Sequence, residues 1–510
     1  MAFFGAIAVK RSLLALLLTL GFVFQTAAQA PKAAVVPTAS AVAQAKTHYK
    51  VPYVTKTLAN GLQVIVYPDT GVPLVTVEMA VRNGSFTEPP ELNGLSHLYE
   101  HMFFKTNKAI GLYRCDIAKS RGYVDYMLNN NCGELAKLKP EIGDTSYLNQ
   151  LDASGFIRNG STQEEYVNYY YTATAPNVAL LMHAMRDAML YPTFDEKEFK
   201  DEIQVVIGEL DRQQSEPGYY LERTMMDKLF YKYPSRKNPG GTRETVTTAT
   251  TEKMRLIQSR YYVPNNEALI ICGDVKPDEI FKLAEQYFGE WKRGEDPFVK
   301  FPLVEHPPLP KSEAVFVEEP VNNVFIQVGW QGPSIGKDNA STYAADVFSF
   351  ITEQPNSRFQ RDLIDSGLAT SADIFYYTQR NVGPIRITLA TTPEKAKAAT
   401  AALYNEISHF NDPDYFTDEE LANAKTLVEA RDQFEREKLS EYSHTLGFWW
   451  SSTGIEYYSG YYDNLRAITR ADINKYVSTY IQGKPHIGLA MLSPESRSSA
   501  NLTEADLIGK

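Results

Sequence analysis

The spacing of apolar residues along the chain predicts both strands and long helices. The runs LQVIVYPD and LVTVEMAVRNGS are rich in valine and bounded by turn residues, which is typical of β-strands. The segments that begin at Phe194 (FDEKEFKDEIQVVIGELDRQQ) and Phe416 (FTDEELANAKTLVEARDQFE) open with acidic residues and continue with apolar residues at helical spacing. We therefore expect a fold that contains both kinds of element.

The two long helical segments indicate an internal repeat. Each is followed about 65 residues later by an apolar strand, ALIICGDV in the first case and HIGLAMLS in the second. When the two initial phenylalanines are superposed, Glu209 falls on Arg431 and Glu202 falls on Ala424. The second half is therefore interpreted as a copy of the first half that lacks its carboxylates.

The length of 510 residues predicts two or more domains. The stretch 297–312 (PFVKFPLVEHPPLPKS) contains so many prolines that we expect a linker without regular structure. After it the strand pattern resumes with VFIQVGW, and a helix is expected from about Ser341. We predict a catalytic domain at residues 47–296. The second predicted domain, residues 313–510, is a homologous copy without catalytic residues.

The first thirty residues have the pattern of a secretory signal peptide. Lys10 and Arg11 precede an apolar run over residues 13–24, and the small-x-small sequence at 28–30 is typical of a cleavage site. An uncleaved anchor is the alternative, but the run is short for a membrane span. Residues 31–46 are rich in alanine and proline and are expected to be a disordered tether. We expect a periplasmic or secreted protein without a later membrane segment.

Charge and cysteine content narrow the possible partners and compartments. The formal net charge of −11 argues against nucleic acid or an anionic membrane as a partner. Cys115 and Cys132 lie in a polar stretch and could pair in an oxidising compartment, with a gain of roughly 3 kcal/mol. Cys272 lies in an apolar run and is expected to be a buried strand residue.

The segment His97-Leu98-Tyr99-Glu100-His101 has the spacing of a metal site. On a helix His97 and His101 are four residues apart and lie on one face, as two imidazole ligands of one zinc ion require. Glu100 borders the same face, so its carboxylate can act as a general base without binding the metal. Two surface histidines beside a glutamate are the alternative interpretation, and the flanking Gly94, Ser96 and Met102–Phe104 argue against it.

Two candidates compete for the third ligand. His183 lies in the helical segment VALLMHAMRDAML, where a histidine more often packs than binds a metal. Glu209 lies seven residues after Glu202, which places both carboxylates on one helical face beside the apolar pair Val205-Val206, which is expected to be buried. Such carboxylates need a cation or a donor if they are buried, although two solvated surface glutamates are the more common case.

These segments resemble the pitrilysin/insulinase family of zinc peptidases, in particular its shorter branch of bacterial and mitochondrial-processing-peptidase-like members. HLYEH matches the family's inverted H-x-x-E-H motif, and DEIQVVIGE matches the helix that carries the third ligand. ASGFIRNGSTQEEYVNYYY and RYYVPNNEALIICGDV match two further family segments. The resemblance implies that Glu209 binds zinc, that Glu202 supports the site without binding the metal, and that Asn159 binds the substrate backbone.

The resemblance also implies an α+β fold. Two homologous domains, each a mostly antiparallel sheet flanked by helices, are expected to face each other across a cavity like a clamshell. The implied activity is that of a zinc endopeptidase acting on short or unfolded peptides, which would add as a strand to a sheet edge. A non-catalytic binding subunit of a two-chain peptidase is the alternative. A zinc-stabilised structural protein would leave Glu100 without a role.

Two departures from the family pattern stand out. His101 and Glu209 are 108 residues apart, whereas relatives have nearly eighty, so an insertion of about thirty residues is expected within 108–148. Many relatives also carry an R-x-K-x-G-L-x-Y-like segment whose Arg and Tyr reach the active site. In RDLIDSGLATS, Leu363 and Thr370 stand at those positions. This absence predicts a heterodimer with a homologous zinc-free chain that supplies the pair.

A shifted register is the competing explanation for the missing pair. Either of two arginines (Arg358 or Arg361) together with either of two tyrosines (Tyr376 or Tyr377) could fill the role from within this chain. That arrangement would permit a monomer or a homodimer.

Overall fold

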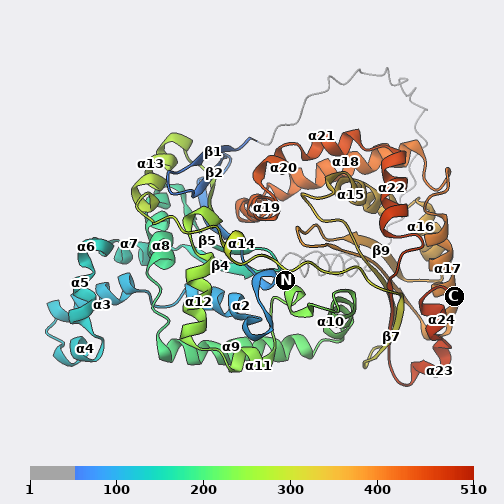
Figure 1. Cartoon of the computed structure of the whole chain (residues 1–510). Helices are drawn as coiled ribbons and strands as arrows, with labels where there is room; N and C mark the ends of the chain where they lie inside the picture. The colour runs from blue at the N-terminus through green and yellow to red at the C-terminus, as the bar shows by residue number, and fades with distance from the viewer. Residues whose placement is uncertain (1–51) are drawn as a thin grey trace, which may run out of the picture. The chain divides into compact units, whose positions relative to one another are not determined.

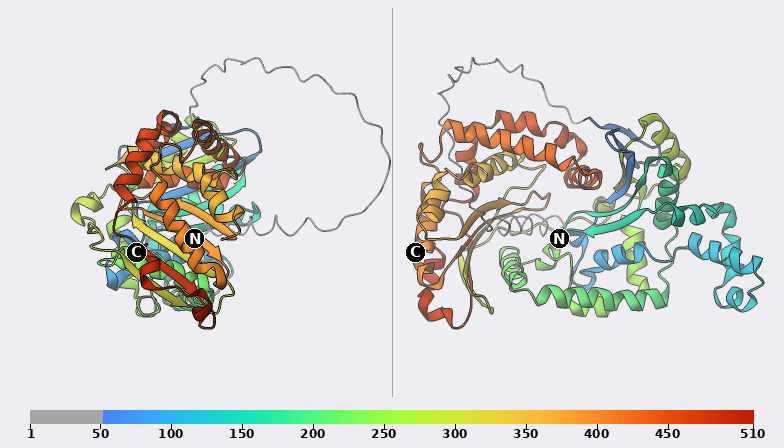
Figure 2. Two further views of the ribbon diagram at one scale, coloured as in Figure 1. Left: turned by 90° about the vertical axis from the view of Figure 1, so that its right-hand side faces the viewer. Right: turned by 180° about the vertical axis from the view of Figure 1, so that it is seen from behind.

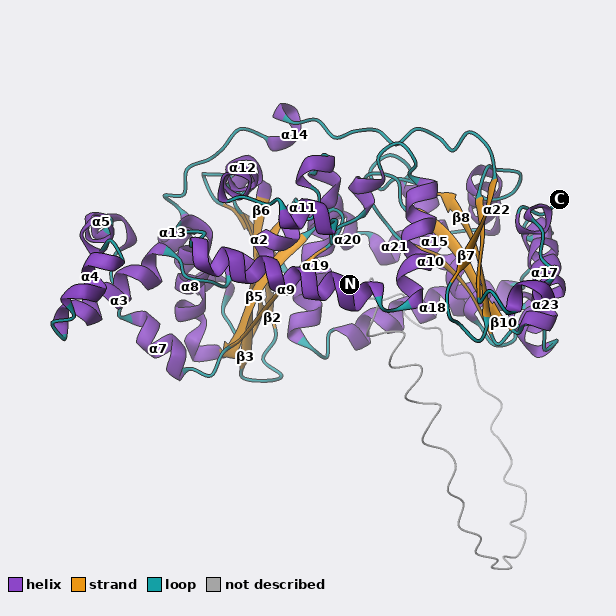
Figure 3. Cartoon of the chain, turned by 90° about the horizontal axis from the view of Figure 1, so that it is seen from below, coloured by secondary structure: helices purple, strands orange, loops and turns teal. Residues whose placement is uncertain are grey.

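The computed structural model describes residues 52–510, so the predicted signal peptide and the whole predicted tether lie outside the described residues. Two mixed sheets, each flanked by helices, form the core of this part of the chain (Figures 1 and 3). The α+β fold implied by the resemblance is confirmed. The first sheet has the order β1 (Val54–Thr57), β2 (Gln63–Pro68), β6 (Glu267–Gly273), β3 (Leu74–Val81), β5 (Val167–Thr174) and β4 (Ile157–Thr162).

The second sheet repeats the topology of the first. Its order is β7 (Glu313–Glu318), β11 (Ile487–Leu492), β8 (Val324–Gln331), β10 (Pro384–Thr391) and β9 (Ser371–Tyr376). Apart from the extra strand β1, both sheets place their first strand in chain order beside their last, and this pair is parallel. All other neighbouring strands are antiparallel. The shared topology supports duplication as the origin of the two halves.

The long helices of the two halves also correspond. Helix α9 (Glu196–Gln214) follows strand β5, and helix α18 (Asp418–Glu435) follows the equivalent strand β10. Val206 of α9 is buried as expected, but Val205 is 47% exposed, so the apolar pair is not buried as a pair. Adjacent residues on a helix point about 100° apart, and only one of the two faces the core here.

One helix of each half packs against the sheet of the other half. Helix α10 (Pro217–Leu229), which follows α9, packs its Met225 and Leu229 against Ile487 and Leu489 of β11. Helix α19 (Leu439–Ser452), which follows α18, packs on β3 and β6 of the first sheet. The close approach requires Gly447, because a Cβ there would lie 2.4 Å from the hydroxyl of Tyr166. The halves therefore share their cores.

The stretch predicted to be an irregular linker contains a short helix. Residues Pro297–Lys300 form α14, and the rest of 297–312 is without helix or strand. Pro297 occupies the first turn, where proline leaves no helical hydrogen bond unmade, and the side chain of Asp296 accepts from Phe298 N. The high proline content predicted an irregular segment, but proline is favoured in the first turn of a helix, where Pro297 lies.

The segment between α2 (Leu95–Phe103) and β4 forms a helical lobe. Its helices are α3 (Lys108–Ser120), α4 (Val124–Asn129), α5 (Cys132–Lys137), α6 (Lys139–Ile142) and α7 (Tyr147–Ala153), and α3–α5 project from the first half (Figures 1 and 2). The base packs through Leu112, Ile142 and Tyr191. A disulfide joins Cys115 to Cys132, while Cys272 is free and buried as predicted. The tip of the lobe, residues 116–131, includes α4, which has no buried residue, so the disulfide is an important constraint on it.

The disulfide should control the local stability of the lobe. We expect a Cys115→Ser/Cys132→Ser variant to lose roughly 3 kcal/mol of the free energy of opening the tip, because the loop of 17 residues is no longer closed. Limited proteolysis should then cut within 116–131 while the remainder of the chain stays intact. Dithiothreitol should sensitise the unmodified protein and leave the variant unchanged. Free thiols at both positions in natively exported protein would contradict the assignment.

Candidate metal centre

A buried carboxylate anchors the helix that carries the HLYEH segment. Helix α2 spans Leu95–Phe103, and its first backbone N–H groups have no partners within the helix. The carboxylate of Glu88 accepts hydrogen bonds from Gly94 N (2.7 Å) and Ser96 N (2.6 Å). The helix dipole also favours a negative group at this N-terminal end. The helix start is therefore held in place within a turn of His97.

The structure brings His97, His101 and Glu209 together. Glu209 Oε2 on α9 lies 3.6 Å from His97 Nε2 and 3.4 Å from His101 Nε2. Among the described residues this is the one group of three or more His, Cys, Asp or Glu with ligand atoms close enough to share an ion, all within 4.8 Å. Two ligands that each lie about 2.1 Å from a tetrahedral zinc ion are about 3.4 Å apart. The donor set and its spacing therefore fit zinc.

A further carboxylate orients His101. Glu202 Oε2 lies 2.9 Å from His101 Nδ1, so the ring can donate from Nδ1 and present Nε2 to the shared centre. The other oxygen of Glu202 forms an ion pair with Lys105, four residues after His101. The sequence interpretation missed Lys105, although its helical spacing from His101 was visible.

The side chain of Glu100, on α2, faces the edge strand β4. Thr162 Oγ1 donates a hydrogen bond to Glu100 Oε2 (2.9 Å). Gly160 lies so close that a Cβ there would come within 2.9 Å of Glu100 Cγ, which explains why this position has no side chain. Neither contact was predicted, because both depend on the placement of β4 and not on local spacing. The carboxylate is thus held beside the histidines and is not drawn into the group of three.

Burial and neighbouring charges give these groups different pKa values. Burial raises the pKa of Glu100 to about 7. Burial and the neighbouring His101 lower the pKa of His97 to about 4. Burial also opposes charge on His101, but hydrogen bonds to Glu209 and Glu202 and the charge of Glu100 outweigh it and raise the pKa to about 8. The hydrogen bond from His101 lowers the pKa of Glu209.

His183 and Asn159 are not part of this group. The ring of His183 stacks on Tyr147 at 3.8 Å and on Tyr287 at 5.0 Å between centroids, which is a packing role. Asn159 is exposed on β4, and its Oδ1 accepts from Gly160 N. The role of Asn159 in binding the substrate backbone stays a prediction.

The second half carries an ion pair at the corresponding place. Arg431 of α18 superposes on Glu209, and it lies 3.4 Å from Glu353 at the end of α15 (Asn339–Glu353). Helix α15 follows β8 as α2 follows the equivalent strand β3 in the first half. The second copy thus has a cation where the first has Glu209, in agreement with the loss of carboxylates that the repeat analysis indicated.

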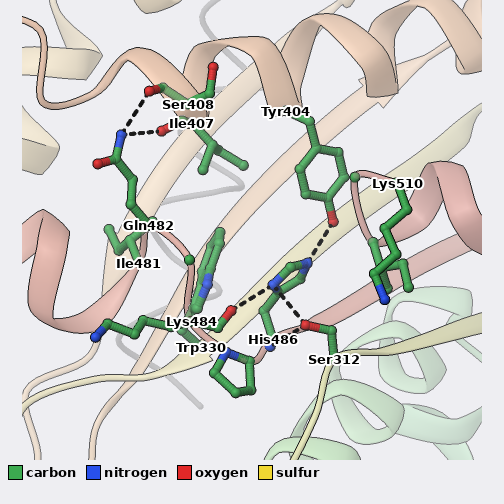
Figure 4. A pocket seen from close by; sticks show the side chains of 14 residues that line it. Ser312, Trp330, Tyr404, Ile407, Ser408, Ile481, Gln482, Lys484, His486 and Lys510 are labelled. Carbon is green, nitrogen blue, oxygen red and sulfur yellow. Dashed lines mark hydrogen bonds between the residues drawn. The ribbon is translucent and has the colours of Figure 1, made fainter.

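A cavity of about 560 Å³ lies elsewhere, in the second half (Figure 4). Its central polar groups are bonded to one another: His486 contacts Tyr404 and Ser312, and Gln482 donates to the carbonyls of Ile407 and Ser408. The candidate functional site is therefore the group around His97 and not this cavity.

Comparison with known families identifies the chain. The family model described as "Insulinase (Peptidase family M16)" matches residues 64–111 and 141–239, and the model "Peptidase M16 inactive domain" matches residues 248–428. The chain belongs to peptidase family M16. The unmatched residues 112–140 fall inside the predicted insertion and coincide with most of the projecting lobe. The resemblance found in the sequence is confirmed.

Known M16 proteins resemble this chain over most of its length. It is 23% identical to the "Uncharacterized zinc protease YmxG" of Bacillus subtilis, over 72% of this chain and 81% of that protein. A protease from Helicobacter pylori has a similar fold, with a TM-score of 0.72, 19% identity and coverage of 86% of this chain and 99% of its own. An M16 inactive domain from Pseudomonas fluorescens gives a TM-score of 0.67 at 13% identity, covering 86% of this chain and 97% of its own.

The residues weighed for the missing Arg/Tyr pair are mostly engaged within the second half. Leu363 is buried, and Thr370 Oγ1 donates to Ala390 O. Arg358 lies near Glu406 and Asp412, and Tyr376 donates to Pro333 O. Arg361 likewise bonds to the carbonyl of Asn356. Tyr377 differs, since its hydroxyl donates to Gln163 Oε1 (2.7 Å), next to Thr162 in the first half.

Proposed function

We propose that this M16 chain is a zinc-dependent endopeptidase that hydrolyses peptide bonds in short or unfolded peptides outside the cytoplasm. The observation that carries the proposal is the convergence of His97, His101 and Glu209, with Glu100 beside them. The names of its zinc protease relatives support the same chemistry. The proposed catalytic domain is residues 47–296 and the proposed non-catalytic domain is residues 313–510, joined by 297–312.

In this proposal His97, His101 and Glu209 hold the zinc ion. Bound zinc would supply Lewis acidity, which polarises a carbonyl and makes water a better nucleophile near neutral pH. Glu100 takes the proton of the attacking water and returns it to the leaving amine. The hydrogen bond from Thr162 occupies Oε2 of Glu100, which leaves Oε1 to carry the proton. Glu202 holds the ring of His101 in the orientation that its role as a ligand needs.

The substrate is proposed to add as a strand to β4. This strand is the last in its sheet, and among the described residues its outer edge has no paired strand. Backbone pairing selects extended chains and is indifferent to most side chains. Because Gly160 and Thr162 of β4 both contact Glu100, a peptide paired there would lie beside the general base. Asn159 would contact the backbone of that peptide.

Peptide cleavage tests the proposal. The zinc-loaded chain should cut members of an unfolded peptide library, a chelator should stop cleavage, and added zinc should restore it. A folded protein of the same composition serves as the control and should stay intact. Peptide binding without cleavage in the presence of zinc would instead support the non-catalytic subunit, a possibility raised by the match of residues 248–428 to an inactive domain.

The partner is also proposed, since Leu363 and Thr370 lack the directed donors of an Arg and a Tyr. Losing one oxyanion donor typically costs about 10²- to 10³-fold in rate. We therefore expect the chain alone to cleave peptides weakly and to recover that factor with a homologous zinc-free subunit, the complex having roughly twice the 57.4 kDa mass of one chain. Full activity without a second gene product would refute the heterodimer and favour Tyr377 in a monomer or homodimer.

No helix of residues 52–510 has the length and apolar character needed to cross a bilayer. The proposed location, periplasmic or secreted, rests on the signal-peptide pattern of residues 1–30. Fractionation of cells that express the full chain, together with sequencing of the mature N-terminus, tests it.

A further inference from the structure

A carboxylate is buried between the first sheet and the helix lent by the second half. Glu78 of β3 has no exposed surface. Its Oε1 accepts from the hydroxyl of Tyr166 and from Asn168 Nδ2 (3.0 Å). Its Oε2 lies 2.6 Å from Ser443 Oγ and 2.6 Å from His444 Nδ1, both on α19. The donors thus come equally from the two halves of the chain.

The contact with α19 has the character of an ion pair. A buried carboxylate is tolerated where donors and an opposite charge replace water. Burial alone would raise the pKa of Glu78, but the charge of His444 and the hydrogen bonds around it lower that pKa. The same carboxylate raises the pKa of His444 against the effect of burial. Removing either partner would leave the other buried without its opposite charge.

Asn168 connects this pair to the strand beside Glu100. Its Oδ1 accepts a hydrogen bond from Ser161 Oγ (2.6 Å) on β4. Side chains alternate along a strand, so Ser161 points to the opposite face from Gly160 and Thr162, which touch Glu100. Strand β4 is therefore held on one face by the Glu78 cluster and meets the proposed general base on the other.

The turn of the same hairpin is also held by the second half. Glu165, between β4 and β5, accepts hydrogen bonds from the backbone N–H groups of Arg380 (2.7 Å) and Asn381 (2.8 Å). Lys237, which is 2% exposed, donates to the carbonyls of Asn381 and Val382 and so fixes that connection from the first half. An edge strand has one strand neighbour, so such contacts supply the constraint that a second neighbour would give.

We propose that Glu78, Asn168 and His444 are positioning residues that transmit the docking of α19 to strand β4. Through Ser161 they set the position of the edge that binds the substrate backbone and of the contacts that hold Glu100. The metal-free half would thereby act on catalysis without contributing a ligand. The effect on cleavage rests on the proposed peptidase function, whereas the effect on the strand does not.

Two variants cut the connection at different points. His444→Ala removes the charged donor on α19, and Ser161→Ala leaves the contact between the halves intact and removes its link to β4. We expect kcat/KM for an unfolded peptide to fall about tenfold in the first, which loses a bond to a charged group, and about threefold in the second, which loses a neutral bond. Zinc content should be unchanged, since His97, His101 and Glu209 lie on α2 and α9.

Hydrogen exchange gives a readout that is independent of peptidase activity. Deuterium uptake in residues 157–162 should rise in both variants, while uptake in α2 stays as in the unmodified chain. His444→Asn, whose amide nitrogen can replace Nδ1, should restore most of kcat/KM. His409→Ala is the matched control, because the polar contacts of this side chain are with Asn405, Ser408 and Asp412 of its own segment, and it should change nothing.

Unchanged exchange in 157–162 together with unchanged kcat/KM would overturn the proposal, even if the variants unfold at a lower temperature. If His444→Ala does not fold, Ser161→Ala decides by the same two measurements. An unmodified chain that cleaves no peptide would overturn the proposed function, and the exchange experiment would still test the link to β4.

Discussion

Glu100→Gln should retain zinc and lose peptidase activity by about 10²- to 10⁴-fold, the usual contribution of a positioned acid or base. The amide oxygen can still accept the hydrogen bond from Thr162, so the strand contact and the shape of the site are kept. An amide cannot take the proton of the attacking water, because it has no basic oxygen at neutral pH. The substitution therefore removes proton transfer and leaves the rest of the site almost unchanged.

The measurement is the rate of peptide hydrolysis at matched zinc content, determined by metal analysis of the same samples. Glu91→Gln is the control, since Glu91 is an exposed glutamate six residues before His97. It should match the unmodified chain in both zinc and rate. Substantial turnover by metal-loaded Glu100→Gln would show that another group takes the proton.

Glu209→Gln should weaken zinc binding and abolish cleavage. A neutral amide replaces the one anionic ligand of the group, and the remaining ligands are the two imidazoles of His97 and His101. Glu202→Gln should have a partial effect, about 10- to 100-fold in zinc affinity or activity, as is typical for a group that orients a ligand. It removes the charge that faces His101 Nδ1 and Lys105 but leaves all three proposed ligands.

Zinc affinity by competition with a chelator, measured beside the cleavage rate, separates the two glutamates. Glu196→Gln, an exposed residue in the first turn of the same helix, is the matched control and should change neither quantity. If Glu209→Gln retained full zinc occupancy and the full cleavage rate, another residue would have to be the third ligand. His183 would be a poor replacement, because its ring is stacked between Tyr147 and Tyr287.

Local spacing was enough for the features that belong to a single element. His97 and His101 share a helix face because four residues make about one turn, and Glu202 shares a face with Glu209 for the same reason. The strands and the long helices were visible in the apolar pattern. The repeat was visible too, and both sheets have the same strand order. Such features follow from backbone periodicity, which is written directly into the order of residues.

The sequence was less informative about which face of a helix is buried and which distant residues are in contact. Val205 was expected to be buried and is exposed, because periodicity marks a stripe on a helix and not its width. The disulfide between Cys115 and Cys132 could be named as possible, but the geometry that permits it depends on the packing of α3 against α5. Thr162 carried no signal at all, since a threonine in a strand is ordinary until its partner is known.

The sequence by itself indicated the candidate metal ligands His97 and His101 and the internal repeat. The choice of Glu209 as third ligand and the α+β architecture came from the family resemblance. The tertiary structure decided which of these side chains meet: Glu209 lies beside His97 and His101 although the lobe separates them in the sequence, and Glu202 contacts His101. It also decided that α19 covers the first sheet and that Glu78 faces His444, 366 residues away. Spacing along one helix is a local property of the backbone, whereas contacts between distant segments depend on how whole faces pack, and no single stretch of sequence contains that information.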